Sequence, residues 1–286
     1  MNTKQYLIKP KEKVDLAGRP TRRDENVDKD EAVEKLMPQN LAAMAELQEK
    51  LYAQNRHALL IVLQAMDAAG KDGAIKHVMS GLNPQGVQVV SFKQPSSEEL
   101  DHDYMWRICK ALPRRGEIGI FNRSHYEEVI VTRIHNLVAN QQIPLELVDK
   151  DIWEERYRQM NDFERHLSEN GTRVVKIYLH LSKDEQRDRL LDRIREEDKN
   201  WKFSSGDVQE RRYWDEYMKA YDEMMEKTST AWAPWYCVPA DSKWYARYVI
   251  SQIVRQELES INPQFPELAQ SEKAVLEECR LLLEQQ

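Results

Sequence analysis

The residues best suited to chemistry lie at positions 66–73, directly after the continuous apolar run at 57–65. Such a run is typical of a strand buried on both faces. A buried strand, a tight turn and a helix N-terminus bring backbone N–H groups to one point, where they can bind phosphate. Lys71, at the start of the expected helix, adds a positive charge for phosphate oxygens. The segment therefore predicts a phosphate-binding turn.

The turn departs twice from the usual P-loop pattern G-x-x-x-x-G-K-[ST]. Ala65 replaces the first glycine, and Asp72 replaces the Ser/Thr that would bind magnesium. Asp67 and Asp72 flank Lys71, which makes sense if magnesium lies between these carboxylates and the substrate. Asp67 could instead orient the attacking phosphate oxygen, and the simplest alternative is an ordinary helix start with a solvated Lys71. The rest of the turn is expected to bind phosphate through its backbone: Ala68, Ala69, Gly70 and Gly73.

A second polar group follows the apolar strand expected at 117–121, which ends in Asn122 and Arg123. In P-loop folds the strand beside the loop ends in a polar residue near the metal. Asn122 offers a neutral oxygen ligand, and Arg123 can stabilise phosphoryl charge. The alternative for Arg123 is a salt bridge at the start of the next helix.

A third candidate region is a helix expected from residue 182 to about 197, which alternates four arginines with acidic residues. Most of these charges fit a solvated helix with i,i+4 ion pairs. In nucleotide kinases, however, an arginine-rich helical lid closes over the transferred phosphate. Arg189 and Arg193 lie one turn apart on one face and are the two residues expected to contact it.

Strands that alternate with helices must position these residues. Strands are expected at 57–65, 86–92, 117–121, 173–181 and 235–238, and helices at 30–56 (with a kink or break at Pro38), 97–112 (capped by Ser97), 124–139, 152–169, 182–197, 207–227, 241–260 and 271–286. This order predicts an α/β fold with a parallel sheet covered on both faces. The simplest architecture is one domain over residues 1–286, with an extended arm at 1–28 and a helical extension at 263–286 that covers its own domain or a partner subunit; we favour its own domain.

The composition argues against several classes of function. The net charge of −7 argues against a general nucleic-acid binder, although a local groove can still bind a polyanion. No apolar run is long enough to cross a bilayer, and the first residues lack a secretory signal, so we expect a cytoplasmic protein. Three distant cysteines indicate neither a zinc site nor a disulfide framework.

Several motifs in matching order resemble the polyphosphate kinase family 2. They are QAMDAAGKDG, GEIGIFNRSHYEEV, IWEERYRQMNDFERHL, LLDRIREEDKNWKFSSGD and KTSTAWAPWYCVPADSKWY, and the resemblance runs from about residue 6 to 261. It is strongest to the short single-domain branch that phosphorylates nucleoside mono- and diphosphates. The family implies a three-layer α/β/α P-loop fold like that of thymidylate kinase, a helical lid at about 182–206, dependence on Mg²⁺ (or Mn²⁺), and homo-oligomers such as dimers or tetramers.

By position, the resemblance assigns active-site roles to loop, second-motif and lid residues. These are Asp67, Lys71, Asp72, Asn122, Arg123, Arg189 and Arg193, with Asp67, Asp72 and Asn122 as metal ligands, Lys202 as a basic residue near the lid, and Glu127 near the nucleobase. A polyphosphate chain also needs a basic track, for which the candidates are Lys76, Lys93, Arg107, Lys110, Arg114 and Arg115. His102 and His125 lack metal-ligand spacing, and we expect them to pack rather than to catalyse.

The function expected from these residues is reversible, direct in-line transfer of the terminal phosphoryl of inorganic polyphosphate to AMP or ADP, with GMP, GDP and other nucleotides as further acceptors. No residue stands out as a covalent nucleophile. One alternative is an ATP-dependent nucleoside monophosphate kinase, which would need Ser/Thr in place of Asp72. The other is a polyphosphate or nucleotide sensor that binds without turnover.

Overall fold

The computed structural model describes residues 2–285, and Met1 and Gln286, at the ends of the expected arm and final helix, lie outside the described residues. Within this range the strands are β1 (Leu7–Ile8), β2 (Ala58–Ala65), β3 (Val87–Ser91), β4 (Ile118–Asn122), β5 (Thr172–His180) and β6 (Trp235–Pro239). The helices are α1 (Met37–Gln54), α2 (Lys71–Val78), α3 (Ser97–Leu100), α4 (Trp106–Lys110), α5 (Val131–Ile134), α6 (Ile152–Glu169), α7 (Lys183–Arg195), α8 (Ser205–Glu210), α9 (Trp214–Thr228), α10 (Lys243–Ile261) and α11 (Gln270–Glu284).

One sheet organises the described chain, with the strand order β1-β6-β5-β2-β4-β3. Neighbours from β6 to β3 are parallel, as the alternating pattern predicts. The edge strand β1 is antiparallel to β6, so the sheet is mostly rather than wholly parallel. The expected N-terminal arm therefore adds to the sheet, and it buries Tyr6, Ile8, Val14 and Leu16.

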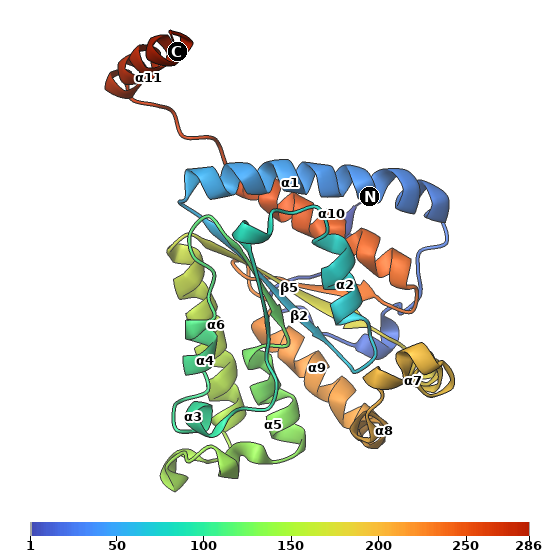
Figure 1. Ribbon diagram of the computed structural model, residues 1–286. Coiled ribbons are helices and arrows are strands. Elements are labelled where there is room, and N and C mark those ends of the chain that lie inside the picture. The colour runs from blue at the N-terminus through green and yellow to red at the C-terminus, as the bar shows by residue number, and fades with distance from the viewer. Residues whose placement is uncertain (1, 286) are drawn as a thin grey trace.

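Helices cover both faces of the sheet and make a three-layer α/β/α fold (Figure 1). Side chains of α1, α2 and α10 pack with one face of the central strands. Side chains of α6 and α9 pack with the other face. All eight residues of β2 are buried, because this strand lies inside the sheet with a helical layer on each side.

Two expected helices are broken, for local reasons. The helix expected at 97–112 is the short α3 followed by the short α4, and its N-cap is Ser96, not Ser97, since Ser96 and Glu99 form a reciprocal capping box. The helix expected at 124–139 consists of a 3₁₀ helix (His125–Val129), α5 and a second 3₁₀ turn. It breaks at Ile130 and again at Asn136, which has a φ of 51°, a conformation that Asn tolerates better than most residues.

Two further helices differ in detail. Pro38 does not end its helix: a π-helical turn at Glu31–Leu36 passes into α1, and Pro38 lies in the first turn of α1, where its missing N–H costs little. The helix expected at 207–227 is interrupted by a 3₁₀ turn at Arg211–Tyr213 between α8 and α9.

The C-terminal helix corrects one expectation. None of the residues of α11 in the described chain is buried, and the helix stands away from the body of the protein (Figure 1). Val275, Leu276, Leu282 and Leu283 are all more than half exposed. The expectation that this helix covers its own domain is therefore wrong.

Candidate active site

The phosphate-binding turn lies at the carboxyl end of β2, between β5 and β4. It connects β2 to α2 through two residues with positive φ, Ala68 (61°) and Gly70 (103°). Glycine adopts this conformation freely, whereas Ala68 is held there at a cost. Gly70 is the N-cap of α2, and the first-turn amides that follow it have no acceptor within the helix. These amides form the kind of site that binds anions.

Lys71 lies underneath this turn. Its ammonium donates to the carbonyl oxygens of Ala65 at 3.0 Å and Met66 at 3.4 Å, and the residue is buried. Burial lowers the pKa of Lys71, while the carboxylate of Asp67 acts in the opposite direction. A buried positive charge close to the loop amides favours an anion at this point.

Asp67 and Arg123 face one another across the site. Arg123 Nη2 lies 2.7 Å from Asp67 Oδ1, and Arg123 Nη1 lies 3.9 Å from Glu127 Oε2. Burial works to lower the pKa of Arg123, but Glu127 and Asp67 outweigh it and leave this pKa raised. Burial also raises the pKa of Glu127, against the effect of Arg123. Arg123 itself has a φ of 63°, a strained conformation that is typical of functional sites.

The polar end of β4 contacts the start of α2. Parallel pairing sets Asn122 opposite Leu63, and the Asn122 amide donates to Asp72 Oδ1 at 2.6 Å. Among residues 2–285 no three His, Cys, Asp or Glu side chains form a preassembled metal cluster. Magnesium commonly takes only one or two carboxylates and completes its shell with water and substrate phosphates. The donor set of Asp67, Asp72 and the Asn122 amide oxygen therefore fits such a cation.

The residues of the expected lid lie at different depths. Arg189 is buried, and its guanidinium donates to Ala68 and Ala69 of the turn. Arg193 is further out and forms an ion pair of 2.6 Å with Asp207. Burial raises the pKa of Asp207, and the charge of Asp67 adds to this effect. Lys202 is exposed, with its ammonium 4.9 Å from the Trp201 ring.

Three residues near the turn were not predicted from the sequence. Gln186 donates to the Asp67 carbonyl at 3.0 Å. Burial, reinforced by the charge of Arg189, lowers the pKa of both Lys243 and Arg247. Both lie on α10, which follows the carboxyl end of β6. Since ligands bind at the carboxyl ends of parallel strands, this position was the sequence feature that could have indicated a role in the site.

The candidates for a polyphosphate track are spread over the molecule. Lys76 lies exposed on α2, about one helical turn beyond the binding turn. Lys93, Arg107 and Lys110 gather beside edge strand β3, where Arg107 donates to the Lys93 carbonyl. Arg114 and Arg115 precede β4 and therefore lie at the amino edge of the sheet, opposite the binding turn. These two residues do not belong to the site.

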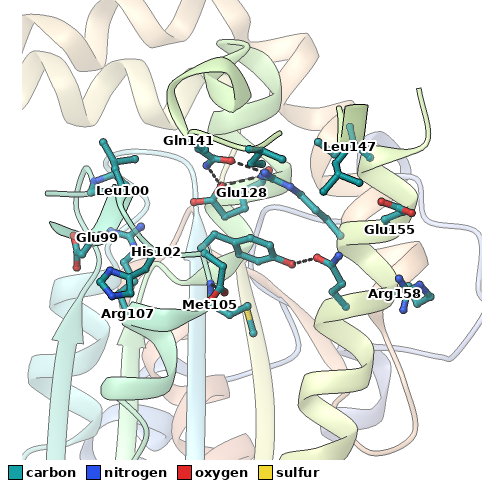
Figure 2. Close-up of a pocket in the computed structure, with 17 residues that line it drawn as sticks. Glu99, Leu100, His102, Met105, Arg107, Glu128, Gln141, Leu147, Glu155 and Arg158 are labelled. Carbon is teal, nitrogen blue, oxygen red and sulfur yellow. Dashed lines mark hydrogen bonds and ion pairs between the residues drawn. The ribbon is translucent and has the colours of Figure 1, made fainter. Parts of the chain in front are cut away.

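A separate cavity of about 610 Å³ opens between α3, α4 and α6 (Figure 2). Its wall includes a buried ion pair of 3.0 Å between Arg156 and Glu128, which Gln141 also contacts. No residue of the phosphate-binding turn lines it.

The two histidines considered from the sequence, His102 and His125, both pack against other residues. His125 is buried, and His102 stacks on Trp106 at 3.9 Å between ring centroids.

Comparisons with known proteins agree with this geometry. Residues 26–266 match the family model described as polyphosphate kinase 2. The chain is 49% identical over 282 residues to the ADP-polyphosphate phosphotransferase of Rhodopseudomonas palustris, covering 98% of each chain. It is 48% identical to the AMP/ADP-polyphosphate phosphotransferase of Meiothermus ruber, covering 82% of this chain and 84% of that one.

A solved structure extends the similarity to three dimensions. The crystal structure of polyphosphate kinase 2 from Arthrobacter aurescens superposes with a TM-score of 0.84 at 42% identity, covering 93% of each chain. The family match spans the binding turn, the second motif and the lid region. The chain therefore belongs to the polyphosphate kinase 2 family.

Proposed function

We propose that the protein transfers the terminal phosphoryl of inorganic polyphosphate to AMP or ADP, reversibly, at the turn that follows β2. The enzyme is a polyphosphate-dependent nucleotide phosphotransferase, as its relatives are named. The observation that carries the proposal is the 2.7 Å pair of Asp67 and Arg123 beside the amide-lined turn. This arrangement joins an anion-binding site to a carboxylate suited to a cation.

The residues act by position and charge. The turn amides and Lys71 hold phosphoryl oxygens, and Arg123 neutralises charge that develops during in-line transfer. Glu127, expected near the nucleobase, lies beside Arg123, so the acceptor nucleotide is proposed to approach from this side. Arg193 and Lys202 are proposed to close over the site with the lid. No side chain is assigned a covalent role.

Phosphotransferases of this family generally need a divalent metal. We propose that the metal is Mg²⁺, with Mn²⁺ as a substitute, and that Asp67, Asp72 and Asn122 would hold it. When bound, the cation neutralises phosphate oxygens. The protein's own part is to keep two carboxylates and one amide at a single edge of the sheet, since β2 and β4 are paired in register.

The polyphosphate chain is proposed to extend past Lys243 and Arg247 toward Lys76. Lys243 and Arg247 each have a pKa lowered by burial and by the charge of Arg189. Positive charges that disfavour one another are stabilised when a polyanion binds among them. This stretch of α10 and α2 therefore suits the polyphosphate donor better than Lys93, Arg107 and Lys110 near β3.

We also propose one domain over residues 1–286 that forms a homo-oligomer, a dimer or tetramer, in the cytoplasm. The exposed apolar side chains of α11 support a partner subunit. The three cysteines are free, which suits a reducing compartment. In the described chain no helix combines the length and apolar character that a membrane span needs.

The test is a chromatographic assay of nucleotides after the purified protein is mixed with Mg²⁺, long-chain polyphosphate and AMP or ADP. Formation of ADP or ATP without added ATP is the expected result. A reaction of ATP with AMP but none with polyphosphate would instead identify an ATP-dependent nucleoside monophosphate kinase. Binding of polyphosphate without any turnover would identify a sensor.

A further inference from the structure

Arg189 uses every donor of its guanidinium within the protein. Nε donates to Glu185 at 2.8 Å, and Nη1 donates to the carbonyls of Ala68 at 3.1 Å and Ala69 at 2.9 Å. Nη2 donates to the carbonyls of Ala240 at 2.7 Å and Asp241 at 2.9 Å. A guanidinium carries five N–H groups, so none is left for a phosphate oxygen in this geometry.

These bonds join three separate segments: α7, the phosphate-binding turn, and the connection between β6 and α10. Gln186, the third residue before Arg189 on the same helix, adds a bond to the Asp67 carbonyl at 3.0 Å. Helix α7 therefore holds three consecutive carbonyls of the turn, those of residues 67–69. Lys71 holds the two that precede them, at residues 65 and 66.

The direction of these carbonyls decides where the amides point. In a trans peptide the C=O and N–H groups point in opposite directions. No peptide bond in residues 2–285 is cis. Because the carbonyls of residues 67–69 face α7, the N–H groups of residues 68–70 face away from α7, and the Ala69 N–H donates to the Met66 carbonyl at 3.3 Å. Ala68 and Gly70 both have positive φ in this arrangement.

We propose that Arg189 is a positioning residue that holds the phosphate-binding turn in its anion-binding conformation, and not a ligand of the transferred phosphoryl. The inference deepens the proposed function, and its kinetic readout rests on that function. Lysine is not equivalent here, because an ammonium has three donors around one point and cannot satisfy the five acceptors that the guanidinium contacts. Only the planar fork reaches both pairs of carbonyls at once.

The first test needs no substrate. Hydrogen exchange in the free protein is followed by mass spectrometry in peptides that cover residues 66–73 and 239–243. R189A and R189K are expected to raise exchange there about tenfold, since each loses several charge-assisted hydrogen bonds. The matched control is R187A, which removes an exposed arginine of the same helix and should leave these peptides unchanged. Unchanged exchange in R189A overturns the proposal.

The second test uses turnover with polyphosphate and ADP. A positioning role predicts that R189K is as impaired as R189A to within about threefold, because the charge alone does not restore the geometry. A role as phosphate ligand predicts that R189K retains much more activity than R189A, and that result overturns the proposal. If R189A does not fold, the hydrogen exchange of R189K at residues 66–73 and 239–243 decides the question: raised exchange supports the positioning role, and unchanged exchange overturns it. Absence of polyphosphate turnover in the wild type refutes the proposed function but leaves the exchange test intact.

Discussion

The first prediction concerns a buried ion pair between Lys176 and Glu164, which contacts Tyr126 of the GEIGIFNRSHYEEV motif (residues 116–129). Lys176, on β5, is fully buried, and its ammonium lies 2.5 Å from Glu164 Oε2 on α6. The same ammonium donates to Tyr126 Oη at 2.8 Å and to the Thr228 carbonyl at 2.7 Å. Burial acts to raise the pKa of Glu164, but Lys176 and His125 outweigh it and hold this pKa below its ordinary value.

The perturbation is Glu164→Leu, which leaves Lys176 with neutral partners only. Removing one partner of a buried pair costs about 3–5 kcal/mol of unfolding free energy. An unfolding entropy of about 2.1 cal/mol/K per residue over 286 residues gives about 0.6 kcal/mol/K. The expected fall in Tm is therefore about 5–8 °C.

The assay is thermal unfolding followed by circular dichroism for Glu164→Leu, Lys176→Met and the double variant. Because the double variant leaves no unpaired charge, it should be less destabilised than either single variant. The Arg165–Asp162 pair on the surface of α6 provides the control, and Asp162→Ala should change the unfolding free energy by less than about 1 kcal/mol. Single variants with a Tm equal to that of the wild type would refute the reasoning.

Three further predictions follow from the site and the termini. Asp67→Asn should nearly abolish turnover at an unchanged Tm, because the carboxylate proposed to hold the metal is lost; near-normal kcat would remove Asp67 from its role. Burial lowers the pKa of Lys71 from 10.5, so its ammonium is lost as pH rises through the lowered value. The alkaline limb of kcat/KM should therefore lie below pH 10.5 and move upward in Lys71→Arg, and an identical limb in both proteins would contradict this. Removal of residues 263–286 should leave the Tm of the monomeric core unchanged, since α11 buries nothing in the described chain, and light scattering should show a smaller assembly if α11 joins subunits. A fall in Tm at constant assembly size would show that α11 packs on its own domain.

The sequence predicts the sheet well, because the strands that carry the site are apolar runs buried on both faces. The run at 57–65 and the segment ending in Asn122 could be read directly, and parallel pairing then brings their ends together. Capping and left-handed residues were harder to predict. The breaks at Ile130 and Asn136 depend on local backbone geometry that helical periodicity does not reveal.

The candidate site was predictable only in part. The turn residues follow β2, and Asn122 and Arg123 lie at the end of β4, so it could be inferred that these two groups lie close together. The surroundings of Arg189 could not be, because four of its five acceptors are backbone carbonyls from two distant segments. Lys243 and Arg247 follow the parallel strand β6, which was an available signal, but the packing of α10 against α2 could not be inferred from a motif.

The most direct test of the central proposal is transfer of label from ³²P-polyphosphate to unlabelled ADP in the presence of Mg²⁺. Direct in-line transfer predicts label in the terminal phosphate of ATP and no label bound to protein that is trapped during turnover. Asp67→Asn should transfer no label. Label that stays in polyphosphate while the γ-phosphate of labelled ATP enters AMP would contradict the proposal.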